Sequence, residues 1–102
     1  MKYTACFPAP SIQKGFQKVL EDILPKDLQE AMMKAVEALE ENPRPFGRKF
    51  FKTISPPVEF YEHVAHYRIR IGDYRILYDV NDERKIVWIL ALRKRNEKTY
   101  RS

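Results

Sequence analysis

The most informative segment of the chain is HYRIRIGDYRILY, residues 66–78. In its first half charged and apolar residues alternate, which is the pattern of a β-strand with one buried face. Gly72-Asp73 then matches a two-residue hairpin turn with glycine in the first position. The alternation resumes at Tyr74 and continues to Val80. The segment therefore predicts a β-hairpin with strands at 66–71 and 74–80.

A two-residue turn also sets which residues oppose each other across the hairpin. Arg70 lies opposite Arg75, Arg68 follows one pleat further along the same face, and His66 opposes Asp79. Like charges in directly opposed positions destabilise a sheet and are normally avoided. Arginine forks bind phosphate oxygens in pairs, so converging arginines indicate an anion site. The alternative is a solvated sheet face whose charge is partly neutralised by nearby carboxylates.

Further strands are predicted on both sides of this hairpin. Residues 86–92 form a run of seven apolar residues, which suits a strand buried on both faces. This strand delivers Arg93, Lys94 and Arg95 to one end of the sheet.

Two more strands are expected earlier in the chain. Residues 49–54 are predicted to form a short strand that Ser55-Pro56-Pro57 interrupts, because proline disrupts a strand ladder. Residues 3–7 can add an edge strand.

The first half of the chain predicts two helices with apolar residues at helical spacing. The first begins at a Ser11 cap and ends before Pro25. The second begins at Asp27, whose spacing to Glu30 resembles a capping box, and it stops at Asn42. The expected fold class is α+β, with a small antiparallel sheet and an N-terminal helical hairpin packed on one side.

Composition narrows the class of partner. The chain has 102 residues and a net charge of +5, and residues 43–102 carry 14 of its 19 basic side chains but only 7 of its 14 acidic ones. A basic half on a small domain favours a polyanionic partner, nucleic acid before membrane. The length suits one core, and neither a repeat nor a domain boundary interrupts the pattern, so 1–102 is expected to form one domain.

Composition also excludes several chemistries. A single cysteine, Cys6, rules out a disulfide framework, and two histidines without paired ligands make a metal site unexpected. No glycine-rich phosphate loop is present, so no cofactor is expected. No apolar run approaches the roughly 20 residues of a membrane span, and the N-terminus does not read as a signal peptide. A cytoplasmic protein without a membrane partner is expected.

Strand parity separates the tyrosines into two groups. Tyr67, Tyr74 and Tyr78 fall on the apolar face of the hairpin and are expected in the core. Tyr100 lies in the basic C-terminal segment, where no apolar periodicity buries it. An exposed tyrosine there can stack on an unpaired RNA base.

Three segments carry a resemblance to a known family. They are Glu41-Asn42-Pro43, Gly47-Arg48-Lys49-Phe50-Phe51 and the hairpin segment up to Tyr78, followed by an apolar strand, a basic segment and a late tyrosine. In this order they resemble the RelE/ParE toxin superfamily over nearly the whole chain. The resemblance implies a small antiparallel sheet with two helices on one side. RelE-type members cleave mRNA in the ribosomal A site and are held inactive by an antitoxin, whereas ParE-type members poison DNA gyrase.

The resemblance also implies the site residues. The implied catalytic side chains are Arg68, Arg70, Arg75, Arg95 and Tyr100. Counted back from the tyrosine, Lys94 takes the place of Arg95. The lysines expected to contact RNA are Lys49, Lys52, Lys94 and Lys98.

The implied reaction is attack of an RNA 2′-hydroxyl on the adjacent phosphate, which needs a base, an acid and positive charge on the developing phosphorane. Some members carry lysines where this chain has Arg68 and Arg70. A guanidinium titrates far above neutrality and is a poor proton acceptor. His66, on the same face, is therefore a candidate general base. The alternatives, which depend on folding to bring them near, are Lys49, Lys52, Lys94 and Lys98. The stretch 56–63 also looks longer than is usual in the family between these two strands.

The implied partners are a cognate antitoxin, the ribosome and mRNA, with operator DNA contacted only through the antitoxin. A ParE-like toxin that inhibits gyrase by binding, without RNA cleavage, is the alternative. An inactive member of the fold is a third possibility.

Overall fold

The computed structural model describes residues 2–22, 24–60 and 62–94. The predicted hairpin is formed by β3 (His63–Ile71) and β4 (Tyr74–Asn81). Arg70 pairs with Arg75 and Arg68 with Leu77, as the turn predicts. Gly72 has a φ of +61°, a left-handed conformation that glycine adopts without a Cβ clash.

Five strands form one sheet in the order β1-β5-β4-β3-β2. β2 (Phe51–Phe60), β3, β4 and β5 (Ile86–Lys94) pair antiparallel, whereas β1 (Thr4–Cys6) runs parallel to β5. The edge strand expected at 3–7 is therefore present, but it makes the sheet mixed. β1 pairs with the last strand of the chain, so no tight turn imposes an antiparallel direction on it.

β2 departs from the prediction, because it continues through the segment that was expected to interrupt it. Thr53 pairs with Tyr67 and Val58 with Ala65, and the register shifts between these two pairs. The prolines of this segment fall at the irregularity and on an outer strand. Proline lacks an N–H, and an outer strand tolerates this because one of its edges has no partner strand.

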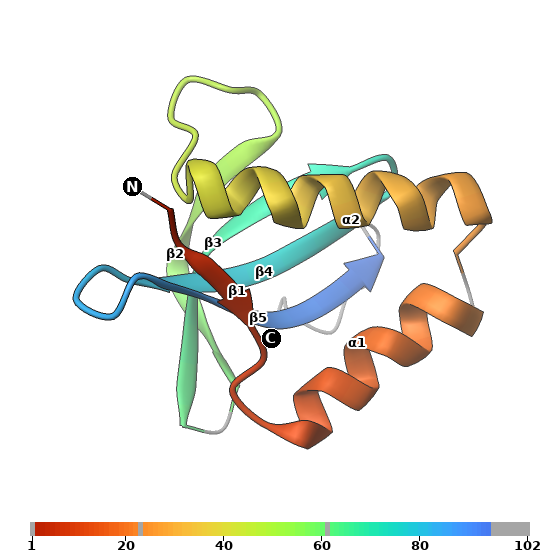
Figure 1. Cartoon of the computed structure of the whole chain (residues 1–102), viewed down its shortest axis with the longest axis horizontal. Helices are drawn as coiled ribbons and strands as arrows, with labels where there is room; N and C mark the ends of the chain where they lie inside the picture. The colour runs from red at the N-terminus through yellow and green to blue at the C-terminus, as the bar shows by residue number, and fades with distance from the viewer. Residues whose placement is uncertain (1, 23, 61, 95–102) are drawn as a thin grey trace.

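α1 (Pro10–Asp22) and α2 (Lys26–Glu41) form the expected helical pair, and Figure 1 shows α2 lying across the sheet. The ends differ in detail from the prediction. Ser11 lies inside α1 rather than before it, and Pro25 occupies the N-cap position of α2 without a side-chain hydrogen bond. α1 begins at Pro10 and α2 directly follows Pro25. Proline suits the start of a helix because an N–H there would have no partner within the helix.

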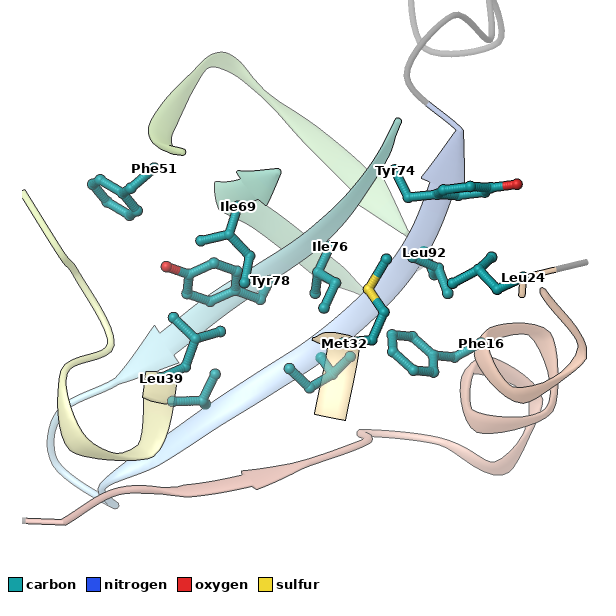
Figure 2. Close-up of a cluster of buried hydrophobic side chains, with 12 residues drawn as sticks. Phe16, Leu24, Met32, Leu39, Phe51, Ile69, Tyr74, Ile76, Tyr78 and Leu92 are labelled. Atoms are coloured by element: carbon teal, nitrogen blue, oxygen red, sulfur yellow. The ribbon is translucent and has the colours of Figure 1, made fainter. Parts of the chain in front are cut away.

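The main core lies between the helices and the face of the sheet that carries Tyr78, here called the helix face. Figure 2 shows side chains of both helices meeting those of β3, β4 and β5, with Met32 between Ile76 and Phe16. A smaller group packs separately and is here called the outer cluster. It consists of Ile12, Ala65, Leu77 and Leu90, with partly buried neighbours that include Val58 and Phe60.

The outer edge of β1 is covered by one residue of α2. The Tyr3 N–H donates to the Glu40 carbonyl oxygen at 2.8 Å, and the Ala5 N–H donates to the Glu40 carboxylate at 2.8 Å. Glu40 thus accepts hydrogen bonds from two backbone N–H groups, that of Ala5 in β1 and that of Tyr3 directly before it.

Arg44 connects the loop after α2 to the sheet. Its Nε donates to the Tyr67 hydroxyl at 2.9 Å, and its two terminal nitrogens donate to the two Asp82 oxygens at 3.1 and 2.9 Å. The Tyr3 hydroxyl also donates to Asp82 at 2.6 Å. These hydrogen bonds lower the pKa of Asp82 from its ordinary 3.8 to about 2.

Truncation of the core methionine should be costly. Met32 is fully buried and Met33, its neighbour in α2, is 51% exposed. Met32→Ala is expected to lower the free energy of unfolding by about 2–5 kcal/mol, because it removes buried apolar surface and leaves a cavity. Met33→Ala is the matched control and should change it by less than about 0.5 kcal/mol. Urea denaturation measures both, and equal losses would contradict the assignment of the core.

The Asp82 contacts should make stability depend on acid pH. The folded-state pKa lies below the ordinary value, so the stabilisation is present above about pH 4 and is lost as the pH falls towards 2. Asp82→Asn should lower the melting temperature at pH 7 and flatten its decline between these two pH values. Glu41→Gln is the control, because the Lys2–Glu41 pair is 68% exposed on both sides and contributes little. An unchanged acid profile in Asp82→Asn would contradict this role.

Candidate functional site: an arginine row on the open sheet face

Three arginines occupy consecutive positions across three neighbouring strands. Arg70 of β3 pairs with Arg75 of β4, and Arg75 pairs with Arg93 of β5. Adjacent paired residues have Cα atoms about 4.5–5.5 Å apart, so the three side chains leave the same face within a short span. This set is here called the arginine row. It lies on the face opposite the helix face, because its residues alternate with buried Ile69, Ile76 and Leu92.

Arg93 joins the row because of a register shift in β5. Tyr78 pairs with Ile89 but Leu77 pairs with Ala91, which leaves Leu90 as an extra residue. Without this bulge Arg75 would pair with Leu92. Sequence reasoning brought Arg93 to the end of the sheet but did not place it in the site. Seven consecutive apolar residues show no alternation between the two faces, so the sequence gives no sign of a bulge among them. The charge of Arg93 was the one signal that this residue lies on the exposed face.

The next positions away from the turn carry two further cations. Arg68 pairs with Lys52 on one side and Leu77 on the other. Lys52 is exposed, and Arg68 is half-buried. The predicted strand cations Arg68, Arg70 and Arg75 and the predicted lysine Lys52 therefore share one face.

The other predicted lysines are not all brought to this face. Lys49 is exposed in the turn that precedes β2. Lys94 pairs with Tyr74, whose side chain lies on the helix face. Neighbouring residues of a strand point to opposite faces, so Arg93 belongs to the row and Lys94 does not. Three predicted site residues, Arg95, Lys98 and Tyr100, lie outside the described residues.

His66 makes the contact that the hairpin register predicts. Its Nδ1 lies 3.0 Å from Asp79 Oδ1, with the two side chains 48% and 30% exposed. A carboxylate on one ring nitrogen orients the imidazole and leaves Nε2 directed elsewhere. Successive residues on one strand face are about 6.8 Å apart, so His66 is one such step from Arg68 and two from Arg70.

The three hairpin tyrosines occupy the core, as parity predicts. Tyr74 and Tyr78 are buried, and Tyr67 packs against the main core. The Tyr78 hydroxyl donates to the Pro43 carbonyl at 2.6 Å, and burial raises the Tyr78 pKa. These tyrosines are therefore structural supports of the site.

The described residues of the site supply fixed positive charge. Residues 2–22, 24–60 and 62–94 contain no group of three His, Cys, Asp or Glu side chains that could hold a metal ion. Within the same ranges, no helix has the length and apolar character needed to span a bilayer. A row of guanidinium groups on an open sheet suits binding of an extended polyanion.

This fold, a mixed sheet with two helices, is that of the RelE/ParE toxin superfamily. The family model described as ParE toxin of the type II toxin–antitoxin system, parDE, matches residues 10–99. The chain therefore belongs to this family of type II toxins. A comparison with the curated proteins finds no match.

Solved structures of related toxins share this fold. The archaeal RelE–RelB complex from Pyrococcus horikoshii OT3 is similar at 31% identity and a TM-score of 0.68, over 95% of this chain and 99% of that chain. The toxin–antitoxin complex RelBE2 from Mycobacterium tuberculosis follows at 25% and 0.60, over 93% and 100%. A mutant of the E. coli toxin RelE in the free state shares the fold at 22% and 0.55, over 94% and 86%.

Removal of one charge from the arginine row should stabilise the fold. Arg70 is exposed and opposes Arg75 directly. Arg70→Gln is expected to raise the free energy of unfolding by about 0.2–1 kcal/mol at low salt, because it relieves like-charge repulsion. The gain should shrink in about 1 M salt, where the screening length falls to about 3 Å.

The control for this measurement is Lys14→Gln, which removes one positive charge from an exposed position of α1. Thermal denaturation at two salt concentrations compares the two variants. If Arg70→Gln stabilises the chain no more than Lys14→Gln does, repulsion within the row is negligible.

Proposed function

We propose that this chain is the toxin of a type II toxin–antitoxin pair that cleaves mRNA on the ribosome. The observation that carries the proposal is the arginine row, three arginines paired across neighbouring strands on one sheet face. Directly opposed arginines cost stability, and a bound phosphate offsets that cost because its negative charge attracts all three guanidinium groups. The similarity to RelE toxins, 31% identical in one case, supports the same activity.

The reaction is an internal transfer at one phosphate. The 2′-oxygen bonds to phosphorus and the bond from phosphorus to the 5′-oxygen breaks, which leaves a cyclic phosphate and a 5′-hydroxyl. A base takes the proton of the 2′-hydroxyl and an acid returns one to the leaving oxygen. Arg70, Arg75 and Arg93 hold the phosphate and stabilise the charge that develops on its oxygens.

His66 remains the candidate base in this scheme. The Asp79 carboxylate lies 3.0 Å from its Nδ1 and orients its ring. Arg68 lies between His66 and Arg70 on the same face of β3, so it would hold the scissile phosphate on the side of the row that faces His66. The catalytic roles of Arg95 and Tyr100 and the RNA contacts of Lys49, Lys94 and Lys98 stay predictions of the sequence.

The partners follow from this function. A cognate antitoxin would hold the chain inactive, as supported by the similarity to two toxins solved within toxin–antitoxin complexes. The ribosome and mRNA would be its targets, and operator DNA would be reached only through the antitoxin.

Gyrase inhibition by binding is the second candidate. The observation that favours it is the family model, which is that of the ParE toxin of parDE and covers residues 10–99. Under this alternative the arginine row would contact a protein or DNA surface and carry out no chemistry.

Induced expression separates the two functions. The intact chain is expected to halt translation and to leave mRNAs cut within codons, mapped by primer extension. Arg70→Ala with Arg75→Ala should restore growth and abolish the cuts, because two of the three phosphate-binding side chains are lost. A double variant of exposed lysines on α1, Lys14→Ala with Lys18→Ala, is the charge-matched control and should stay toxic.

Two results would contradict the proposal. A fully toxic arginine double variant would show that the row is not the site. Uncut mRNA together with a DNA-damage response to the intact chain would favour gyrase as the target.

A further inference from the structure

We propose that Phe60, at the far end of β2, positions the Arg93 guanidinium within the arginine row. The Arg93 guanidinium carbon lies 5.0 Å from the centroid of the Phe60 ring. A guanidinium at this distance over an aromatic face is attracted by the negative charge of the ring face. The contact joins two elements that are distant in sequence, the β2–β3 hairpin and the end of β5. Its consequence for RNA rests on the endoribonuclease function proposed above.

The irregular β2 is what brings the hairpin to this position. Residues 54–57 of β2 stand opposite a single residue of β3, His66, and beyond them the ladder resumes up to the pair of Phe60 and His63. Extra residues on one strand bend it and increase its twist. β2 therefore continues past its prolines as part of the sheet up to Phe60.

Packing holds the Phe60 ring in place. Phe60 is half-buried and, like Val58, packs on the outer cluster beside Leu77 and Leu90. Leu90 is also the extra residue of the bulge that brings Arg93 opposite Arg75. The same small cluster thus supports both partners of the contact.

Like charge acts on the position of Arg93. Arg93 stands beside Arg75, and Arg75 stands beside Arg70, so repulsion within the row favours conformations in which the outer guanidinium groups lie away from its centre. The Phe60 ring face attracts the Arg93 guanidinium and is itself uncharged, so this contact adds no negative charge that would compete with a phosphate. Phe60 is therefore a positioning residue for Arg93.

The direct test measures the contact itself, by NMR of the full chain. Ring currents of Phe60 should shift the Arg93 Nε–H and Cδ–H resonances, and Phe60→Leu should remove the shift. Phe60→Tyr keeps an aromatic face and should retain it. Phe46→Leu, which removes a ring that is 69% exposed and packs on Phe51, is the control and should leave Arg93 unchanged. Identical Arg93 resonances in Phe60→Leu and the unmodified chain would overturn the proposal.

A double-mutant comparison tests the functional consequence. Phe60→Leu should slow mRNA cleavage about 3- to 10-fold when Arg93 is present, the range that corresponds to a cation–π contact at a partly exposed site. In the Arg93→Ala background it should have no further effect, and Phe60→Tyr should restore most of the rate. Equal losses with and without Arg93 would show that Phe60 acts only on folding and would overturn the positioning role.

The two measurements can reject the endoribonuclease function and the positioning role of Phe60 separately. If the unmodified chain cleaves no RNA, the endoribonuclease proposal fails, while the NMR comparison still decides whether Phe60 holds Arg93. If cleavage occurs but the resonances do not depend on Phe60, the enzyme stands and the positioning role is wrong.

Discussion

The opposition of Arg70 and Arg75 across one hairpin is the constraint on which the rest of the structure depends. The register that imposes it is set by a two-residue turn and by the apolar residues that alternate with the arginines. A shift by one residue would relieve the repulsion, but it would expose Ile69 and Ile76, which are almost completely buried. Burial on the helix face therefore holds like charges together on the other face.

The two faces divide the work of the molecule. Both helices and the strands β2 to β5 contribute buried side chains to the helix face, where Met32, Tyr78 and Val87 have no exposed surface. Among the described residues, the opposite face carries the smaller outer cluster together with the arginine row. Most of the buried side chains of the described residues therefore belong to the helix face. Residues of the charged face can therefore be selected for binding at little cost in folding stability. Such a separation reduces the competition between activity and stability that is common in proteins.

The sequence predicted what depends on local periodicity. The alternation of residues 66–80 predicted the hairpin, its register, the His66–Asp79 contact and the position of three tyrosines on the helix face. It did not predict features that depend on tertiary pairing. β2 passes through Pro56-Pro57 because it is an outer strand, and the parallel direction of β1 follows from its pairing with β5. Arg93 lies in the row because of a bulge at Leu90. This bulge falls within seven apolar residues, whose pattern does not distinguish one strand register from another.

The two outer strands have a consequence for the behaviour of separate copies of this chain. An outer strand with free backbone groups is a template on which another molecule can add a strand, and this is a common route to aggregation. On β1 the Glu40 residue already occupies the backbone donors of Tyr3 and Ala5. On β2 the two prolines offer no donor and the ladder is bent. Both outer strands, β1 and β2, therefore disfavour the addition of a strand from a second copy of this chain.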